Sequence, residues 1–284
     1  MDTSTRREFL GGAAGALASA NLLAAQTNSS GLDFPLEDYH VHLNVLTIDQ
    51  VVAASKERGV KYGILEHGGT KENEYPVVLS NDKELQGYIA KLEGKGVYIG
   101  MQAEWIDWAP CFSKEVFSQL DYVLTDSWTV RDANGKRVKA FGAGYDPGKD
   151  PAAFMQWYLD WIIEILETTP LDIWAHPMWV TRKFAPYLEQ LWTEERMRRV
   201  VKTLKDTGTA VEIDSSVKLP TKAFLEIAKS EGIKFSFGSS SQGARMNPID
   251  WSIAMAKEVG LTRKDMFQPA PKGRKPIQVR KLRT

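Results

Sequence analysis

Four histidines are the residues of this chain best suited to chemistry, and two of them form a His-x-His pair. His40 and His42 occur in the stretch DYHVHL (38–43), whose pattern predicts a β-strand. Alternate side chains of a strand point to the same face about 6–7 Å apart, so the two imidazoles could converge on one cation. Imidazole suits zinc, iron or manganese better than an ion that requires only oxygen ligands. The alternative is a strand pair that is exposed or only hydrogen-bonded.

Polar side chains also close several other apolar runs that are typical of strands. His67 and His176 each end such a run, and Glu66, Glu104, Asp126 and Asp214 end or nearly end others. An α/β barrel builds one shared site from the ends of different strands, so these residues are expected to meet. A mixed set of histidines and carboxylates selects a divalent transition metal. Such an ion would lower the pKa of a bound water and present hydroxide to an electrophile.

The elements that must position these residues alternate between short apolar runs and longer amphipathic ones. Strands are predicted at 38–43, 61–67, 97–104, 120–128, 171–176, 209–215 and 233–239, and helices near 48–58, 81–95, 152–167, 193–207, 221–231 and 248–259. Helical crossovers favour a parallel sheet. About seven such units without a dinucleotide-type glycine loop favour a closed barrel, and 284 residues suffice for one such domain. The long connections 105–118 and 129–150 both follow strands, where lids and binding loops are common.

The order and spacing of these motifs resemble the polymerase and histidinol phosphatase (PHP) domain family. The matching motifs are HVH (40–42), KERGVK (56–61) leading into LEHG (65–68), QAE (102–104), DIWAHP (172–177), VEIDSS (211–216) and FSFGSS (235–240). The resemblance implies a distorted seven-stranded TIM-like barrel that hydrolyses phosphoesters with up to three metal ions. It places His40, His42, His67, Glu104 and His176 on ligand positions, with Glu104 bridging two ions.

This chain departs from the family pattern at several ligand positions. Trp128 stands where the family usually has a histidine, and Ser240 and Gln242 replace an aspartate and a histidine. The resemblance therefore implies a zinc, manganese or iron centre with fewer than three ions. We expect His40, His42 and Glu104 to hold an ion, with water or a neighbouring carboxylate such as Asp126 completing the shell. His67, His176 and Asp126 are then the candidate catalytic residues, because a positioned imidazole can carry the proton that a leaving group needs.

Aromatic residues near the strand ends indicate how a substrate could be held. The chain has nine tryptophans, of which Trp105 and Trp128 lie at or after strands that should end at the site. Flat aromatic faces suit a sugar or aromatic ligand, although core packing is the alternative. Arg245 could bind an anionic group, and the alternative for this residue is a solvated arginine.

The N-terminus predicts an export signal. The sequence TSTRREFL (3–10) is a twin-arginine pattern, and the weakly apolar segment after it is too short to span a bilayer. We expect a cleaved signal at 1–25 that engages the export machinery, so that the protein is periplasmic or otherwise exported by the twin-arginine route. A barrel domain at 31–270 and a basic tail at 271–284 are expected to follow. The formal net charge of zero gives no indication of a nucleic-acid partner, and the single cysteine excludes an internal disulfide.

The sequence thus predicts an exported metal-dependent hydrolase, most simply a phosphoesterase that acts on a small molecule. Two alternatives remain open. One is a metalloenzyme on the same barrel that acts on a carbohydrate without phosphate, because fold does not fix function. The other is an inert ligand-binding protein, of which the lost ligands would be the signature.

Overall fold

Seven parallel strands form a closed barrel in the computed structural model, which describes residues 32–132, 134–142 and 145–270. The predicted signal (1–25) and tail (271–284) lie outside the described residues. The strands are β1 (Glu37–His42), β2 (Lys61–Leu65) continued by β3 (His67–Gly68), β4 (Tyr98–Ala103), β5 (Tyr122–Thr125), β8 (Ile173–Trp174), β9 (Ala210–Asp214) and β10 (Phe235–Gly238). β1 pairs with both β2 and β10, and β2 and β3 pair with β4, which closes the ring. The predicted TIM-like α/β barrel is confirmed.

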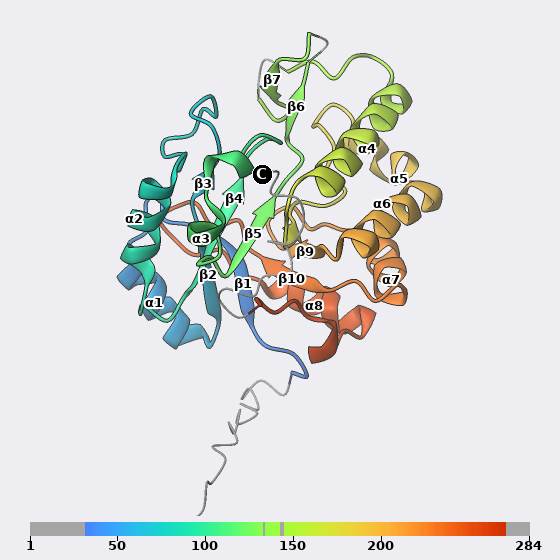
Figure 1. Ribbon diagram of the computed structural model, residues 1–284. Helices are drawn as coiled ribbons and strands as arrows, with labels where there is room; N and C mark the ends of the chain where they lie inside the picture. Colours follow the sequence, from blue (N-terminus) through green and yellow to red (C-terminus); the bar gives the residue numbers. More distant parts are fainter. Residues whose placement is uncertain (1–31, 133, 143–144, 271–284) are drawn as a thin grey trace, which may run out of the picture. The chain divides into compact units, whose positions relative to one another are not determined.

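Helices follow most of the strands and surround the barrel (Figure 1). The long ones are α1 (Ile48–Arg58), α2 (Asp82–Leu92), α4 (Pro151–Thr168), α6 (Glu194–Thr207), α7 (Lys222–Ser230) and α8 (Asp250–Val259), close to the predicted ranges; α3 (Lys114–Phe117) and α5 (Leu188–Leu191) are single turns. Local signals fix their ends. For example, the Thr193 side chain accepts a hydrogen bond from the Arg196 backbone N–H, and Gly208 ends α6 with φ 63°. No helix in the described ranges combines the length and apolarity that a membrane crossing requires.

Tyr122 shows how the barrel interior is filled beneath the strand ends. Its hydroxyl donates to the Tyr39 backbone carbonyl (2.7 Å), and its ring fills the space that two glycines leave open. A Cβ atom on Gly63 would come within 2.4 Å of the Tyr122 hydroxyl, and one on Gly100 within 2.3 Å of its ring. The strands β2 and β4 therefore need glycine at these positions because the tyrosine lies directly against their backbones.

The connection after β5 is more structured than the sequence predicts. The strand expected over 120–128 ends at Thr125, because Asp126 Oδ1 accepts the Trp128 backbone N–H (3.0 Å) and turns the chain out of the barrel. An antiparallel hairpin of β6 (Thr129–Arg131) and β7 (Arg137–Lys139) follows. Arg131 pairs with Glu164 of α4 at 2.7 Å. In Figure 1 this hairpin rises beyond the carboxyl end of β5.

Candidate metal centre

The four histidines form one continuous cluster at the carboxyl ends of the strands. Ring centroids are 4.9 Å apart for His176 and His40, 5.5 Å for His40 and His42, and 4.8 Å for His42 and His67. All four side chains are buried. The expectation that the histidines share one site is confirmed, whereas their assignment as ligands stays a prediction.

One half of the cluster joins His40 and His176 through Glu212 of β9. Glu212 Oε1 lies 2.7 Å from His40 Nδ1, and Glu212 Oε2 accepts the His176 backbone N–H at 2.8 Å. A potential ligand atom from each of these three residues lies within 4.8 Å of the other two. With Nδ1 held by the carboxylate, His40 Nε2 is buried and has no hydrogen-bond partner among the described residues. Metal-binding histidines usually have one ring nitrogen hydrogen-bonded to a carboxylate and the other free to bind the ion. His40 has this arrangement, so the residues fit a transition metal.

His176 forms a buried ion pair with Asp214 at the end of β9. Its Nδ1 lies 2.5 Å from Asp214 Oδ2. Burial lowers the pKa of His176, but the charge and hydrogen bond of Asp214 outweigh it and raise the pKa to about 9. For Asp214, burial raises the pKa, but the charge and hydrogen bond of His176 outweigh burial and lower the pKa to about 2. His176 has φ 47°, in the left-handed region, which indicates a backbone constrained at a functional position.

The other half of the cluster is connected by the side chain of Gln102. Its carbonyl oxygen lies 2.9 Å from His42 Nε2, and its amide nitrogen lies 3.2 Å from both Glu104 Oε1 and Asp126 Oδ2. Glu104 Oε1 also lies 3.0 Å from His67 Nδ1. Burial, followed by the negative charge of Glu104, raises the pKa of Asp126 to about 6. Burial and the neighbouring histidines hold the pKa of His42 well below its usual value, so this imidazole is neutral.

The three predicted substrate-binding residues lie in different surroundings. Trp128 stacks on His176 with a centroid distance of 4.1 Å and an interplanar angle of 14°, so it joins the cluster as an aromatic wall. Trp105 lines the large cavity described below and packs against Trp161. Arg245 is exposed, does not line that cavity, and makes no ion pair with any residue that the structure describes. No hydrogen bond or ion pair joins Arg245 to the histidines among the described residues, and its role in binding an anionic group stays a prediction.

Glu212 and Gln102 are absent from the predicted site residues, although both lie in the motifs quoted for the family resemblance. The signal that could have found them is their place inside apolar strands, AVEID in β9 and YIGMQA in β4. A carboxylate or amide enclosed in a strand is rarely buried without partners. The strand alternation alone does not say which partners those are.

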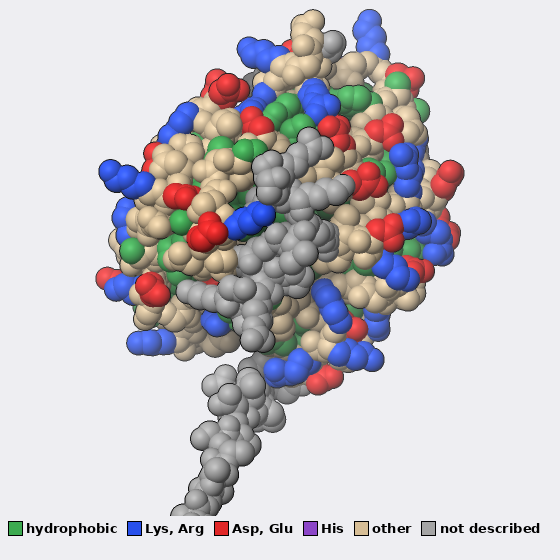
Figure 2. Space-filling view, viewed as in Figure 1, with side chains coloured by type: hydrophobic (Ala, Val, Ile, Leu, Met, Phe, Trp, Pro, Cys, Tyr) green, Lys and Arg blue, Asp and Glu red, His purple; other side chains and the backbone are tan. Residues whose placement is uncertain are grey.

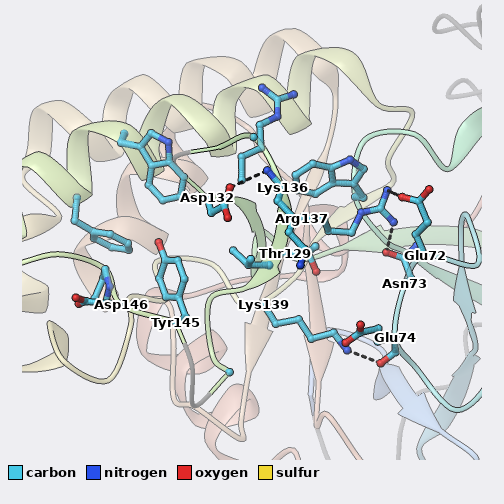
Figure 3. A pocket seen from close by; sticks show the side chains of 18 of the residues that line it. Glu72, Asn73, Glu74, Thr129, Asp132, Lys136, Arg137, Lys139, Tyr145 and Asp146 are labelled. Carbon is cyan, nitrogen blue, oxygen red and sulfur yellow. Dashed lines mark hydrogen bonds and ion pairs between the residues drawn. The ribbon is translucent and has the colours of Figure 1, made fainter.

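A cavity of about 1370 Å³ lies beside the hairpin (Figure 3). The histidines do not line it. Instead, the cavity wall residue Thr129 donates from Oγ1 to Glu104 Oε2 (3.2 Å), one step from the cluster. A second link runs through Tyr75. Its ring stacks on His67 with a centroid distance of 3.6 Å, and the Lys139 ammonium lies 3.7 Å from the centroid of the Tyr75 ring. These contacts place the cavity next to the half of the histidine cluster that contains His67 and Glu104.

The cavity lining combines cations, acids and aromatic rings. Its cations are not equally free: Arg137 is bound to Asp107 and Asn73, both at 2.7 Å, whereas Lys139 hydrogen-bonds only the Glu74 backbone carbonyl (2.6 Å) within the described residues. In Figure 3 both side chains reach toward the loop that carries residues 72–74. The aromatic members are Trp105, Tyr145, Phe154 and Trp157. On the face that Figure 2 shows, by contrast, acidic and basic side chains are interspersed, in keeping with the net charge of zero.

Replacing Gly238 with alanine is expected to displace Glu212. A Cβ atom at Gly238 would lie 1.9 Å from Glu212 Oε1, so the carboxylate would have to move from His40. We expect the variant to lose about 1–3 kcal/mol of stability through overpacking. Gly87→Ala is the control, because nothing lies within 4 Å of its Cβ position; alanine in this helix should stabilise by about 1 kcal/mol. Thermal unfolding of both variants measures the change. A Gly238→Ala variant as stable as the wild type would show that the Glu212 carboxylate can move away without cost.

Comparison with known proteins identifies the fold of this chain. No protein-family model matches the sequence, and no curated protein matches it. Among solved structures, the histidinol phosphate phosphatase of Lactococcus lactis subsp. lactis, complexed with zinc, L-histidinol and phosphate, superposes with a TM-score of 0.57. It is 15% identical over 83% of this chain and 100% of its own. An amidohydrolase is 13% identical over 74% of this chain and 66% of its own, with a TM-score of 0.33. The chain has the α/β barrel fold of the PHP type.

Proposed function

We propose that this chain is a metal-dependent hydrolase whose centre is formed by His40, His176 and Glu212. The observation that carries the proposal is the free, buried Nε2 of His40, which faces no hydrogen-bond partner in the described part of the chain while Glu212 fixes its other nitrogen. An unsatisfied buried imidazole nitrogen is costly, and a bound cation would satisfy it. The histidinol phosphate phosphatase of similar fold was solved with zinc and phosphate, which supports the proposal.

The residues around this centre have separate tasks. A zinc, manganese or iron ion held there would act as a Lewis acid that activates water and stabilises charge developing on the substrate. Asp214 fixes the ring of His176, and Glu104 fixes the ring of His67. The His67 side chain is slightly more exposed than that of His176, and Tyr75 stacks on its face. We assign it the transfer of a proton to the leaving group, with Asp126 as a second candidate for that role.

We propose a small phosphoester as the substrate. Lys139 and Lys136 line the cavity, and neither ammonium group forms an ion pair with a described acidic residue, so both are available to an anionic group. The resemblance in fold to a phosphatase agrees with this choice. The aromatic lining supports a second candidate, a carbohydrate without phosphate, because Trp105 and Trp157 offer faces on which a sugar could stack.

Metal analysis combined with a substrate screen tests the proposal. The purified protein is expected to retain a transition metal and to hydrolyse at least one phosphorylated small molecule, with activity lost on chelation and restored by the metal. Hydrolysis of unphosphorylated sugars alone would favour the second candidate. Absence of metal after purification and after incubation with zinc, manganese and iron would refute the hydrolase proposal and favour an inert binding protein.

We further propose that the twin-arginine segment directs export to the periplasm. The double variant Arg6→Lys with Arg7→Lys is expected to accumulate in the cytoplasm, because the export machinery reads the paired arginines. Fractionation of cells expressing both forms measures the distribution. Normal periplasmic accumulation of the double variant would contradict the proposal, and the wild type would then need another route.

A further inference from the structure

We infer that Gln102 takes the place of a second cation, so that this centre holds a single metal ion. The inference rests on the proposed metal site and adds the number of ions and the residue that limits it. Its basis is the position of the Gln102 amide, which joins His42, Glu104 and Asp126 in one half of the histidine cluster.

The orientation of this amide is determined by its neighbours. Its NH₂ group faces two carboxylates, Glu104 and Asp126, and each of them lies 3.2 Å from the nitrogen. The reverse orientation would place a carbonyl oxygen against both carboxylates, which would be repulsive. The carbonyl oxygen therefore faces His42 Nε2 at 2.9 Å and accepts a hydrogen bond from its N–H.

This arrangement gives Glu104, Asp126 and one nitrogen of His42 a hydrogen-bond partner in the place where a cation could otherwise bind them. The two amide hydrogens are directed at the carboxylates of Glu104 and Asp126, which directly follow β4 and β5. The proton on His42 Nε2 blocks coordination through that nitrogen and leaves only Nδ1, which is buried and without a partner among the described residues. All three side chains are buried, as is Gln102 itself.

The opposite half of the cluster has no such amide among the residues that the structure describes. Between His40, His176 and Glu212, no described amide or cationic side chain hydrogen-bonds the free Nε2 of His40. The cluster thus has one half that is open to an ion and one half that is closed by an uncharged side chain. The geometry gives a reason for a reduced ion count that does not depend on the replaced ligands at Trp128 and Ser240.

Zinc stoichiometry of the wild type and two Gln102 variants tests the inference. Gln102→Glu exchanges the donor for a carboxylate of the same shape, and Gln102→Ala removes the amide without adding charge. Metal-free protein is incubated with Zn²⁺, desalted and subjected to elemental analysis. We expect one zinc per chain in the wild type and two in each variant. Gln190→Glu adds the same charge at an exposed position in α5 and should stay at one.

Thermal unfolding gives a second measurement that does not depend on activity. Metal-free Gln102→Glu should melt below the wild type, because it places a third carboxylate beside Glu104 and Asp126, and Zn²⁺ should raise its melting temperature more than that of the wild type. If this variant does not fold without metal, Gln102→Ala still reports the stoichiometry.

Each possible zinc stoichiometry supports or overturns the inference about Gln102. Two zinc ions in the wild type, or one in both Gln102 variants, would overturn the inference. A wild type without zinc, combined with a Gln102→Glu variant that binds one ion, would refute the proposed hydrolase centre but support the role of Gln102. No zinc in any of the proteins would refute both.

Discussion

Replacing His176 with asparagine is expected to weaken zinc binding by more than about 100-fold, beyond the 10–100-fold typical of a lost outer-shell partner. His176 is one of the three residues whose potential ligand atoms lie within 4.8 Å of one another, and two remaining ligands hold a divalent ion poorly. Asparagine is the suitable replacement because His176 has φ 47°, which asparagine tolerates better than most residues. Competition with a chelator of known affinity measures the change, and hydrolysis should be lost with the metal.

Glu104→Gln provides the comparison for this variant. From the sequence we expect His40, His42 and Glu104 to hold the ion, but in the structure Glu104 is hydrogen-bonded to His67, Gln102 and Thr129. We therefore now expect Glu104→Gln to keep its zinc and to lose turnover, because His67 would no longer be fixed. Loss of zinc from Glu104→Gln with retention in the His176 variant would show that the ion lies in the other half of the cluster.

The second large effect is expected for Glu212→Gln. Both carboxylate oxygens of Glu212 accept hydrogen bonds, one from His40 Nδ1 at 2.7 Å and one from the His176 backbone N–H at 2.8 Å. A carboxamide has a single acceptor oxygen, so one of these donors would face an NH₂ group. The carboxamide keeps one oxygen that could still bind the ion, so we expect zinc binding about 10–100-fold weaker, a smaller loss than in the His176 variant. We also expect a loss of about 1–3 kcal/mol in the free energy of unfolding. Chelator competition and denaturant unfolding measure the two quantities.

Glu66→Gln is the matched control for Glu212→Gln. Glu66 also lies at a strand end and accepts a backbone N–H, that of His67 at 3.0 Å, but it lines a separate, smaller cavity. We expect this control to bind zinc as the wild type does. Equal losses in both variants would mean that carboxylate charge near the barrel end matters in general, and that the contacts of Glu212 are not specific.

The sequence by itself determined the elements and the face on which the site lies. Apolar runs alternate with amphipathic segments that end at residues such as Gly59 and Gly208, and these signals are local. The clustering of the histidines followed from one further rule, that parallel strands of a barrel present their carboxyl ends at the same face. His42 ends β1, and His67 and His176 each follow the end of a strand, so these histidines come together at that face.

The tertiary structure alone decided how the cluster is divided. His40 meets Glu212 across 172 residues, because β10 lies between β1 and β9 and the register of these strands brings the two side chains together. Gln102 reaches His42 across 60 residues in the same way. Local periodicity places a side chain on a face, but only the register of strands distant in sequence selects its partner. For that reason the metal-binding residue types could be predicted from the sequence, whereas the open and closed halves of the centre could not.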